Sequence, residues 1–428
     1  MSTSTDPVAV NTRLIGWSDQ GGRGDGTQIM VNRGHAYIGH LFSGGFSVID
    51  VRDPRAPVPA NFIPSVGATW NHHLQVADDL LFVVDMYDLF GDARFQDEKK
   101  YYGATVYDVL GKEGSASCGI RGEDYSAGMR IFDISEPAKP RQVGQFEIDG
   151  LGIHRIWYVG GKYAYVSALP DGYTDCIFMI LDVSDPAHPF EVSRWWLPGM
   201  HAAGGEEPTW RTGDRVACHH GIVANEIAYV TWRDGGLTIM DVSDAAKPKL
   251  LVHRNWHPPF GGGTHTAVPL TARVPNPKEY LLVADEAVAD ECADGMKHTW
   301  VMDIRDKSNP VSVAVLPTPS ERDWCRVGGH FGPHNLHENR PGSFQSSDVC
   351  FATYENAGVR AFDIRDPLRP AEVASFVPSS DLKVWVDPRP GRPKVVHSCD
   401  VYADPAGLLY VTDLNGGLHI VQYEGPVG

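Results

Sequence analysis

Six histidines recur at one place in a repeated pattern of this chain. They are His73, His154, His220, His265, His334 and His397, and Gln28 stands at the same place in the first copy. The chain has 18 histidines among 428 residues, so a third of them share one position. Neutral imidazole is the commonest protein ligand for zinc, copper, iron and nickel. We therefore predict that these six side chains line a metal site.

Only three or four imidazoles can share one ion, so the others would support the ligands or contact a substrate. Each histidine begins the first strand of a predicted hairpin, and charged residues recur at the end of the second strand. We predict four of them as catalytic residues: Asp85, Arg233, Glu286 and Glu355. A carboxylate there could orient a ligating imidazole or act as a general base. The expected cofactor is a divalent transition metal, namely zinc, manganese or iron, with copper less favoured.

The elements that must position these residues are short β-strands in a long repeat. Each histidine begins a predicted β-hairpin, which leads into a strand such as GGLTIMDVSDAAKP at 235–248. The strand motif has six clear copies, whose aligned aspartates are Asp50, Asp133, Asp182, Asp241, Asp303 and Asp363, and a seventh, altered copy carries Gln422. Side chains of Asp and Ser bond the backbone of tight turns, and proline suits the exit from the strand. We therefore assign the aspartates to the turns rather than to chemistry.

The spacing of the copies predicts the architecture. Five of the six spacings between aligned residues lie between 49 and 62 residues. A period of this length, with about four short strands in each unit, is typical of a β-propeller blade. We predict an all-β fold in which residues 1–428 form a single seven-bladed β-propeller. Residues 12–24 should supply the outer strand of the final blade.

The strand motif resembles the LVIVD repeat family, in which a Leu-Val-Ile-Val-Asp strand precedes a turn that contains proline. The resemblance covers nearly the whole chain and implies a propeller fold. It implies nothing about the reaction. The first spacing is longer than the others because residues 86–126 form an insertion, which we expect to be a lid or a wall of the site.

Other polar and aromatic residues receive weaker assignments. Alternation along a strand would turn His72 and His219 away from the central channel of the propeller, so we expect them to bond a neighbouring blade. His334 and His337 are three residues apart and should not bind one ion on a straight strand. Trp324, in a predicted loop, is a candidate for stacking on a ligand.

The amino-acid composition argues against several classes of function. The formal net charge of -17 opposes a nucleic-acid groove or an anionic membrane patch. The chain has no run of about 18 apolar residues, and its first residues do not resemble a signal peptide. Seven scattered cysteines without a CxxC pair indicate reduced thiols. We therefore expect a cytoplasmic protein, with a small-molecule substrate as partner, no nucleic acid or membrane, and a homo-oligomer as an option.

These observations favour a metal-dependent enzyme acting on a small organic substrate that bears a carbonyl or hydroxyl oxygen, with an aromatic substrate as an option. Hydrolase chemistry, or lyase chemistry such as retro-aldol C–C cleavage, would suit a Lewis-acid ion beside a carboxylate. One alternative is an iron or copper oxidoreductase that uses the same histidines. Another is a non-catalytic interaction scaffold, which would give no reason for six histidines in one register.

Overall fold

The computed structural model describes residues 8–97, 101–110, 124–270 and 279–426. The chain divides into two compact units, and each is described by itself. Unit 1 comprises Met1–Ser43, Ser47–Phe62 and His265–Gly428; unit 2 comprises Gly44–Phe46 and Ile63–Thr264.

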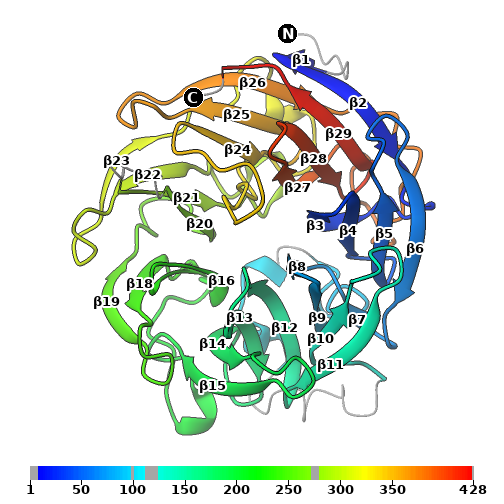
Figure 1. Ribbon diagram of the computed structural model, residues 1–428. Coiled ribbons are helices and arrows are strands. Elements are labelled where there is room, and N and C mark those ends of the chain that lie inside the picture. The colour runs from blue at the N-terminus through cyan, green and yellow to red at the C-terminus, as the bar shows by residue number, and fades with distance from the viewer. Residues whose placement is uncertain (1–7, 98–100, 111–123, 271–278, 427–428) are drawn as a thin grey trace. The chain divides into compact units, whose positions relative to one another are not determined.

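Unit 2 contains three four-stranded antiparallel blades (Figure 1). The second blade of the chain consists of β8 (Leu74–Ala77), β9 (Leu80–Tyr87), β10 (Gly128–Asp133) and β11 (Arg141–Glu147), and the short β7 (Thr69–Trp70) also pairs with β9. The third consists of β12 (Gly150–Trp157), β13 (Tyr163–Pro170), β14 (Ile177–Asp182) and β15 (Phe190–Trp195). The fourth consists of β16 (Val216–Ala224), β17 (Ile227–Arg233), β18 (Leu237–Asp241) and β19 (Lys249–Arg254).

The other four blades belong mainly to unit 1. The first consists of β3 (Gly26–Asn32), β4 (His35–His40), β5 (Gly45–Asp50) and β6 (Val58–Pro64), and the fifth of β20 (Thr264–Leu270), β21 (Tyr280–Asp285), β22 (Thr299–Asp303) and β23 (Val311–Val315). The sixth consists of β24 (Val349–Thr353), β25 (Val359–Asp363), β26 (Ala371–Val377) and β1 (Val8–Val10). The seventh consists of β27 (Ser398–Ala403), β28 (Leu408–Asp413), β29 (Gly417–Tyr423) and β2 (Thr12–Ser18).

The fold is therefore all-β, of the seven-bladed β-propeller class predicted from the repeat. The predicted role of the N-terminal segment is also confirmed, because β2 pairs antiparallel with β29 as the outer strand of the last blade. The sequence did not indicate that β1 adds to β26 of the sixth blade. In that blade the expected inner strand is reduced to one bridge, between Leu336 and Ala352. That residues 1–428 form a single domain stays a prediction.

The repeated aspartates make the turns that the sequence predicted. In each clear copy, one carboxylate oxygen accepts a hydrogen bond from the backbone N–H two residues later, over 2.8–3.1 Å. The six acceptors are Asp50, Asp133, Asp182, Asp241, Asp303 and Asp363. This hydrogen bond stabilises the turn that follows the third strand of each of these blades. The aspartates are therefore turn residues.

Burial along the blades follows the position of each strand. The middle strands β4 and β14 are buried at every residue, because side chains on both faces of a blade are covered. The outermost strand β6 is largely exposed. Between the sixth and seventh blades, Phe351 and Phe376 pack in one apolar cluster with Val401, Val411 and Val421. This packing joins the sixth blade to the seventh.

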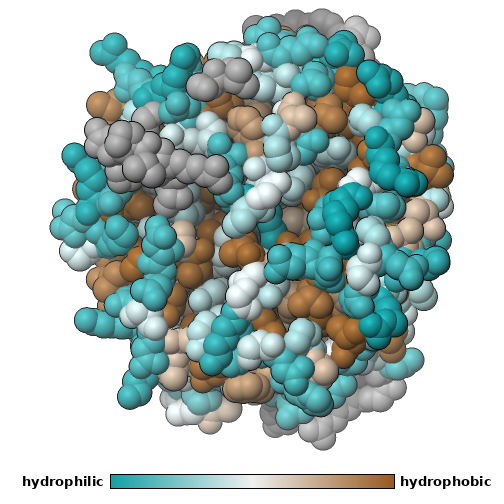
Figure 2. Space-filling model, in the orientation of Figure 1, coloured by the Kyte–Doolittle hydropathy of each residue, from teal (hydrophilic) through white to brown (hydrophobic). Residues whose placement is uncertain are grey.

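The surface is mixed in character. On the face drawn in Figure 2, hydrophilic residues separate the hydrophobic ones into small groups. Within the described ranges, no helix has both the length and the apolar character that a membrane crossing requires.

His419 on β29 is a buried histidine outside the candidate metal sites. Its effect on the pH dependence of the unfolding free energy can therefore be measured separately. Burial lowers the pKa of its imidazole from 6.5 to about 4, so the folded protein keeps it neutral in mild acid. The unfolded chain takes up the proton near pH 6.5, and stability is lost as the pH falls below that value. Between pH 7.5 and pH 5 the wild type should lose about 2 kcal/mol of unfolding free energy more than His419→Leu. Urea unfolding of metal-free protein measures this difference; equal pH profiles would contradict it.

Candidate metal centres

The structure places the predicted histidines at the beginning of their blades. His154, His220 and His265 lie on the inner strands β12, β16 and β20. His73 and His397 directly precede β8 and β27. His334 lies in the segment before β24. Within unit 2, His73 and His154 converge; within unit 1, His265 and His334 converge, and His397 belongs to a neighbouring group.

In unit 1, a carboxylate lies between two of the histidines. His265 Nε2 is 3.6 Å from Glu286 Oε2, and His334 Nε2 is 3.6 Å from Glu286 Oε1. The two imidazole rings are 4.5 Å apart between centroids. All three side chains are buried, and one ligand atom from each lies within 4.8 Å of the others. This set, which we call the Glu286 group, offers two nitrogens and one oxygen to a cation.

Contacts behind the Glu286 group orient its imidazoles. His334 Nδ1 lies 2.7 Å from the carbonyl oxygen of Cys399, to which it must donate a hydrogen. The Nε2 of His334 then carries the lone pair and faces Glu286. His265 Nδ1 lies 2.8 Å from the hydroxyl of Thr266. Such a hydrogen bond on the far nitrogen is the usual support of a metal-bound histidine.

A second carboxylate group lies beside the first in unit 1. It consists of His330, Glu355 and His397, whose ligand atoms also lie within 4.8 Å of one another. His330 Nδ1 is 3.7 Å from Glu355 Oε1, and His330 Nε2 is 3.6 Å from Asp290 Oδ1. The ring of His397 is 6.3 Å from that of His334, so the two groups are neighbours.

Glu355 is a buried carboxylate whose pKa is strongly raised. Its side chain is fully buried, and neither carboxylate oxygen has a hydrogen-bond partner in the described part of the chain. Burial raises the pKa of Glu355 to about 8, and the negative charge of Glu286 acts in the same direction, while His330 opposes it. A carboxyl group with a pKa near neutrality is suited to proton transfer.

Unit 2 holds a group made of histidines alone. His72, His73 and His154 offer ligand atoms within 4.8 Å of one another. His72 Nε2 lies 3.0 Å from His154 Nδ1. The predicted hydrogen bond from His72 to a neighbouring blade is confirmed, since His154 lies on β12 of the third blade. The alternation argument does not apply to His72, because residues 71–73 lie between β7 and β8, and His72 joins two of the predicted histidines.

The imidazoles of this group are held neutral. Burial lowers the pKa of His72 to about 3 and the pKa values of His73 and His154 well below 6.5. The guanidinium of Arg155 acts in the same direction on all three. Neutral imidazole is the form that ligates a metal.

Two other predicted residues of unit 2 lie beside this group. His220 is buried near Trp157, with ring centroids 6.3 Å apart, and it is not among the residues whose ligand atoms converge. His219 was expected to face away, but its ring is 4.9 Å from that of His154, because the register of β16 shifts between Val216 and His220. Arg233 is buried at the end of β17, and its charge lowers the pKa of His154. A catalytic role for Arg233 stays a prediction.

Asp85 is better explained by structure than by catalysis. Its carboxylate accepts hydrogen bonds from Arg130 Nε at 2.9 Å, from Ser126 Oγ at 2.7 Å and from Asn71 Nδ2 at 2.5 Å. Asp85 and Arg130 are both buried. The carboxylate oxygens are thus occupied by a local network, and Asp85 belongs to none of the converging groups found among the described residues. We therefore remove it from the catalytic candidates.

Asp85→Ala should destabilise the protein by about 3–5 kcal/mol, because it leaves the Arg130 guanidinium buried without its carboxylate. The metal content should not change. Chemical denaturation and elemental analysis measure the two quantities. The matched control, Asp85→Ala with Arg130→Met, should lose less stability than Asp85→Ala alone. Loss of metal without loss of stability would restore Asp85 to the site.

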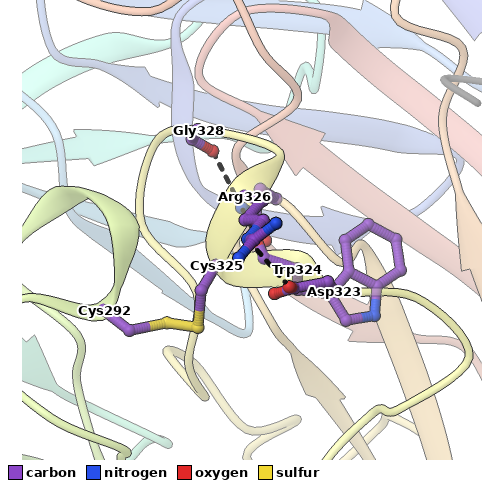
Figure 3. The surroundings of a disulfide bond; sticks show 7 residues. Cys292, Asp323, Trp324, Cys325, Arg326 and Gly328 are labelled. Atoms are coloured by element: carbon purple, nitrogen blue, oxygen red, sulfur yellow. Dashed lines mark hydrogen bonds and ion pairs between the residues drawn. A yellow bond between two sulfur atoms is a disulfide. The ribbon is translucent and has the colours of Figure 1, made fainter. Parts of the chain in front are cut away.

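A disulfide supports the loops of the second carboxylate group. Cys292 and Cys325 are bonded, with their Cα atoms 5.4 Å apart, and they join η3 (Asp290–Cys292) to η4 (Trp324–Arg326) (Figure 3). The first loop carries Asp290, and the second leads into His330. The predicted ligand-stacking residue Trp324 is instead buried, with an exposed fraction of 2%, so that prediction is wrong.

The expectation of reduced thiols is wrong for this pair. Cysteine motifs with short, fixed spacings could not reveal this disulfide, because Cys292 and Cys325 are 33 positions apart and meet only through the fold. Cys176, Cys218, Cys350 and Cys399 are free and buried, and Cys118 lies outside the described residues. Disulfides are rare in the cytosol. One reason for expecting the cytoplasm is thereby removed, and that location stays a prediction.

The insertion predicted as a lid or wall is described in part, over residues 86–97, 101–110 and 124–126. Its helix α2 (Val106–Leu110) begins with a hydrogen bond from Val106 N to Asp175 Oδ2 of 3.0 Å. Asp175 also forms a buried ion pair with Arg215, whose charge lowers the pKa of His154. The described insertion therefore packs on blades of unit 2, while its role as a lid stays a prediction.

The structure brings out three residues that the sequence did not assign to the site. His72 and His330 belong to converging groups, and Asp290 Oδ1 lies 3.6 Å from His330 Nε2. The adjacent pair His72-His73 was a signal in the sequence, but the alternation rule dismissed it. His330 and Asp290 lie in loops, where no periodicity indicates direction.

A last converging group, Asp214, Asp234 and His257, lies in loops of unit 2. Arg211 Nη2 contacts Asp214 Oδ1 at 3.0 Å and His257 Nε2 at 3.1 Å. The guanidinium of Arg211 thus already pairs with the carboxylate of Asp214 in this group.

Comparison with known proteins identifies the repeat. The LVIVD repeat model matches residues 155–195 and 223–253, which correspond to strands of the third and fourth blades. The resemblance seen in the strand motif is therefore confirmed. No curated protein sequence matches the chain.

Solved structures are similar over nearly the full length. The structure of U3-55K has a TM-score of 0.54 and 9% identity, covering 97% of this chain and 100% of that chain. The β-propeller domain of Cps50 (Swd1) from Myceliophteria thermophila has a TM-score of 0.53 and 10% identity, with coverages of 96% and 99%. The periplasmic gluconolactonase PpgL of Pseudomonas aeruginosa has a TM-score of 0.50 and 11% identity, covering 98% of each chain. At such identities the likeness concerns the fold alone.

Proposed function

We infer that this chain, a β-propeller with LVIVD repeats, is a metal-dependent enzyme that acts on a small organic substrate with a carbonyl or hydroxyl oxygen. The reaction class we propose is hydrolysis, or lyase cleavage of a C–C bond of the retro-aldol type. The observation that carries the proposal is the position of Glu286 between the imidazoles of His265 and His334. Imidazole and carboxylate ligands suit zinc, manganese or iron.

The distances in the Glu286 group fit a shared cation. At 3.6 Å, the two nitrogen–oxygen pairs are too far apart for hydrogen bonds. Two donor atoms that each lie about 2.1 Å from one ion, in tetrahedral arrangement, are about 3.4 Å apart. The hydrogen bond from His334 Nδ1 to Cys399 keeps the Nε2 lone pair directed at this place. We propose His265, Glu286 and His334 as the ligands.

The neighbouring group would move the proton. When bound, a divalent ion supplies a Lewis acid to a substrate oxygen. Glu355 would give or take a proton at its carboxylate, because it is buried next to the proposed ligands and has no competing hydrogen bond among the described residues. His330 lies between Glu355 and Asp290, at 3.7 Å and 3.6 Å. Because the Asp290 side chain is 38% exposed, this row of groups offers the buried carboxyl a route to solvent.

The similar structures are compatible with a hydrolase, but they are not evidence that this chain catalyses hydrolysis. One similar structure is named as a gluconolactonase, so a lactonase exists on this fold in another protein. The likeness at 11% identity concerns the fold, and the proposal rests on the side chains of unit 1.

A second candidate function is favoured by the group of three histidines in unit 2. Nitrogen-only donor sets suit iron and copper, which would support an oxidoreductase. A non-catalytic scaffold remains the third alternative, and it requires no metal at all. Self-association into a homo-oligomer stays a prediction.

The test combines metal analysis with an activity screen. Untagged full-length protein would be analysed for transition metals and then assayed on a panel of lactones, esters and β-hydroxy ketones, with and without a chelator. We expect a stoichiometric divalent metal, turnover of at least one panel member, and loss of turnover on chelation that added zinc, manganese or iron reverses. Absence of bound metal, with no thermal stabilisation by any of these ions, would overturn the proposal.

A further inference from the structure

The three histidines of unit 2 form a site that the proposed hydrolase or lyase reaction does not use. His72 and His73 come from the segment between β7 and β8, and His154 comes from β12. Their ring centroids lie 4.4 Å, 4.8 Å and 5.2 Å apart. Three imidazoles from two blades thus converge on one small space inside unit 2, and all three side chains are buried or nearly so.

Hydrogen bonding within the protein leaves part of this group unsatisfied. The contact between His72 Nε2 and His154 Nδ1 uses one nitrogen of each ring. The Nδ1 atoms of His72 and His73 are buried and have no hydrogen-bond partner within the described ranges. A buried polar atom without a partner is rare and needs an explanation. A metal ion would supply the missing partner for ring nitrogens in this space.

The surrounding charges indicate which ligand would bind beside the metal ion. No carboxylate belongs to the converging group, whereas Arg155 and Arg233 both act on His154 through their positive charge. A divalent ion on three neutral imidazoles would keep its full positive charge. With guanidinium groups nearby, the open coordination position would favour an anion over a neutral molecule.

We propose that His72, His73 and His154 bind one transition-metal ion of the zinc, copper or iron type, with an anionic small molecule in the open position. This site shares no residue with the Glu286 group, so the inference does not depend on the proposed function. It assigns His72 as a ligand, although an ordinary strand would have turned that residue away from His73.

Cobalt(II) is the probe, because its visible absorption reports nitrogen ligation without any assay of activity. The background is full-length His265→Ala/His334→Ala protein, stripped of metal with a chelator, in which the Glu286 group has lost both imidazoles. We expect this protein to bind one equivalent of cobalt(II) with visible d–d bands. Adding His72→Gln should weaken binding by about 100-fold or more, since loss of even a supporting residue costs 10–100-fold.

The matched control is His188→Ala, because His188 is 83% exposed and lies in a turn of the same unit. It should leave cobalt binding unchanged. Circular dichroism and the melting temperature verify folding, and His154→Gln provides a second ligand variant should His72→Gln unfold. The proposed site would be disproved if the folded His265→Ala/His334→Ala protein bound no stoichiometric cobalt. Unaltered cobalt binding in both the His72→Gln and His154→Gln variants would disprove it as well. Sodium azide should shift the cobalt spectrum; an unchanged spectrum would overturn the anionic ligand.

Discussion

His334→Ala is expected to remove the metal from the Glu286 group. The imidazole supplies one of three proposed donors, and its Nδ1 hydrogen bond to Cys399 fixes the ring. Loss of a supporting residue alone costs 10–100-fold in metal affinity, so loss of a ligand should cost about 100-fold or more. Zinc affinity would be measured by competition with a chromophoric chelator, in parallel with the zinc content of the purified protein.

Two comparisons make this result specific to the Glu286 group. Glu286→Gln should weaken zinc binding in the same way, because the amide offers a weaker oxygen donor of nearly the same shape. His188→Ala should have no effect, since His188 is exposed and belongs to none of the converging groups. Full zinc affinity in both His334→Ala and Glu286→Gln would show that the 3.6 Å spacing does not reflect a metal site.

Glu355→Gln is expected to lower kcat by about 10²–10⁴-fold on any panel substrate that the wild type turns over, which is the usual contribution of a general acid or base. The substitution keeps the shape of the side chain but removes the exchangeable proton. Because burial raises the pKa of Glu355 to about 8, the carboxyl is mainly neutral at pH 7, and a neutral amide should fit the same space. The melting temperature and zinc content should therefore stay close to those of the wild type.

The control for this prediction is Glu136→Gln, which changes an exposed glutamate in a turn of the second blade. Its kcat should equal that of the wild type. Retention of more than half of the wild-type kcat by Glu355→Gln would remove Glu355 from the proton transfer. Loss of zinc in the same variant would instead place Glu355 among the ligands.

Much of the fold follows from local chemistry that the sequence displays directly. A strand that ends in Asp-X-Ser or Asp-X-Arg makes the same turn wherever it occurs, because the contact spans only two residues. Repetition of that unit predicts the number of blades, and the register of the histidines predicts that they begin the inner strands. These features depend on neighbours in the chain, so one sequence is sufficient to find them.

Convergence of side chains could not be predicted in the same way. The register suggested one set of six histidines, whereas within the units His73 and His154 join His72, His265 and His334 join Glu286, and His397 joins His330 and Glu355. The shift of register in β16 and the irregular backbone at residues 71–73 decide where individual rings point. Such local departures from strand geometry have no periodic pattern in the sequence.

The sequence by itself thus determined the class of fold, the turns and the residue types available for chemistry. The tertiary structure decided which of those residues meet. Asp85 is occupied by Arg130, 45 positions away, and Asp290 reaches His330 through loops that the Cys292–Cys325 bond joins. The physical reason is that a turn depends on contacts between near neighbours, while a site depends on distances of a few ångströms between segments far apart in the chain.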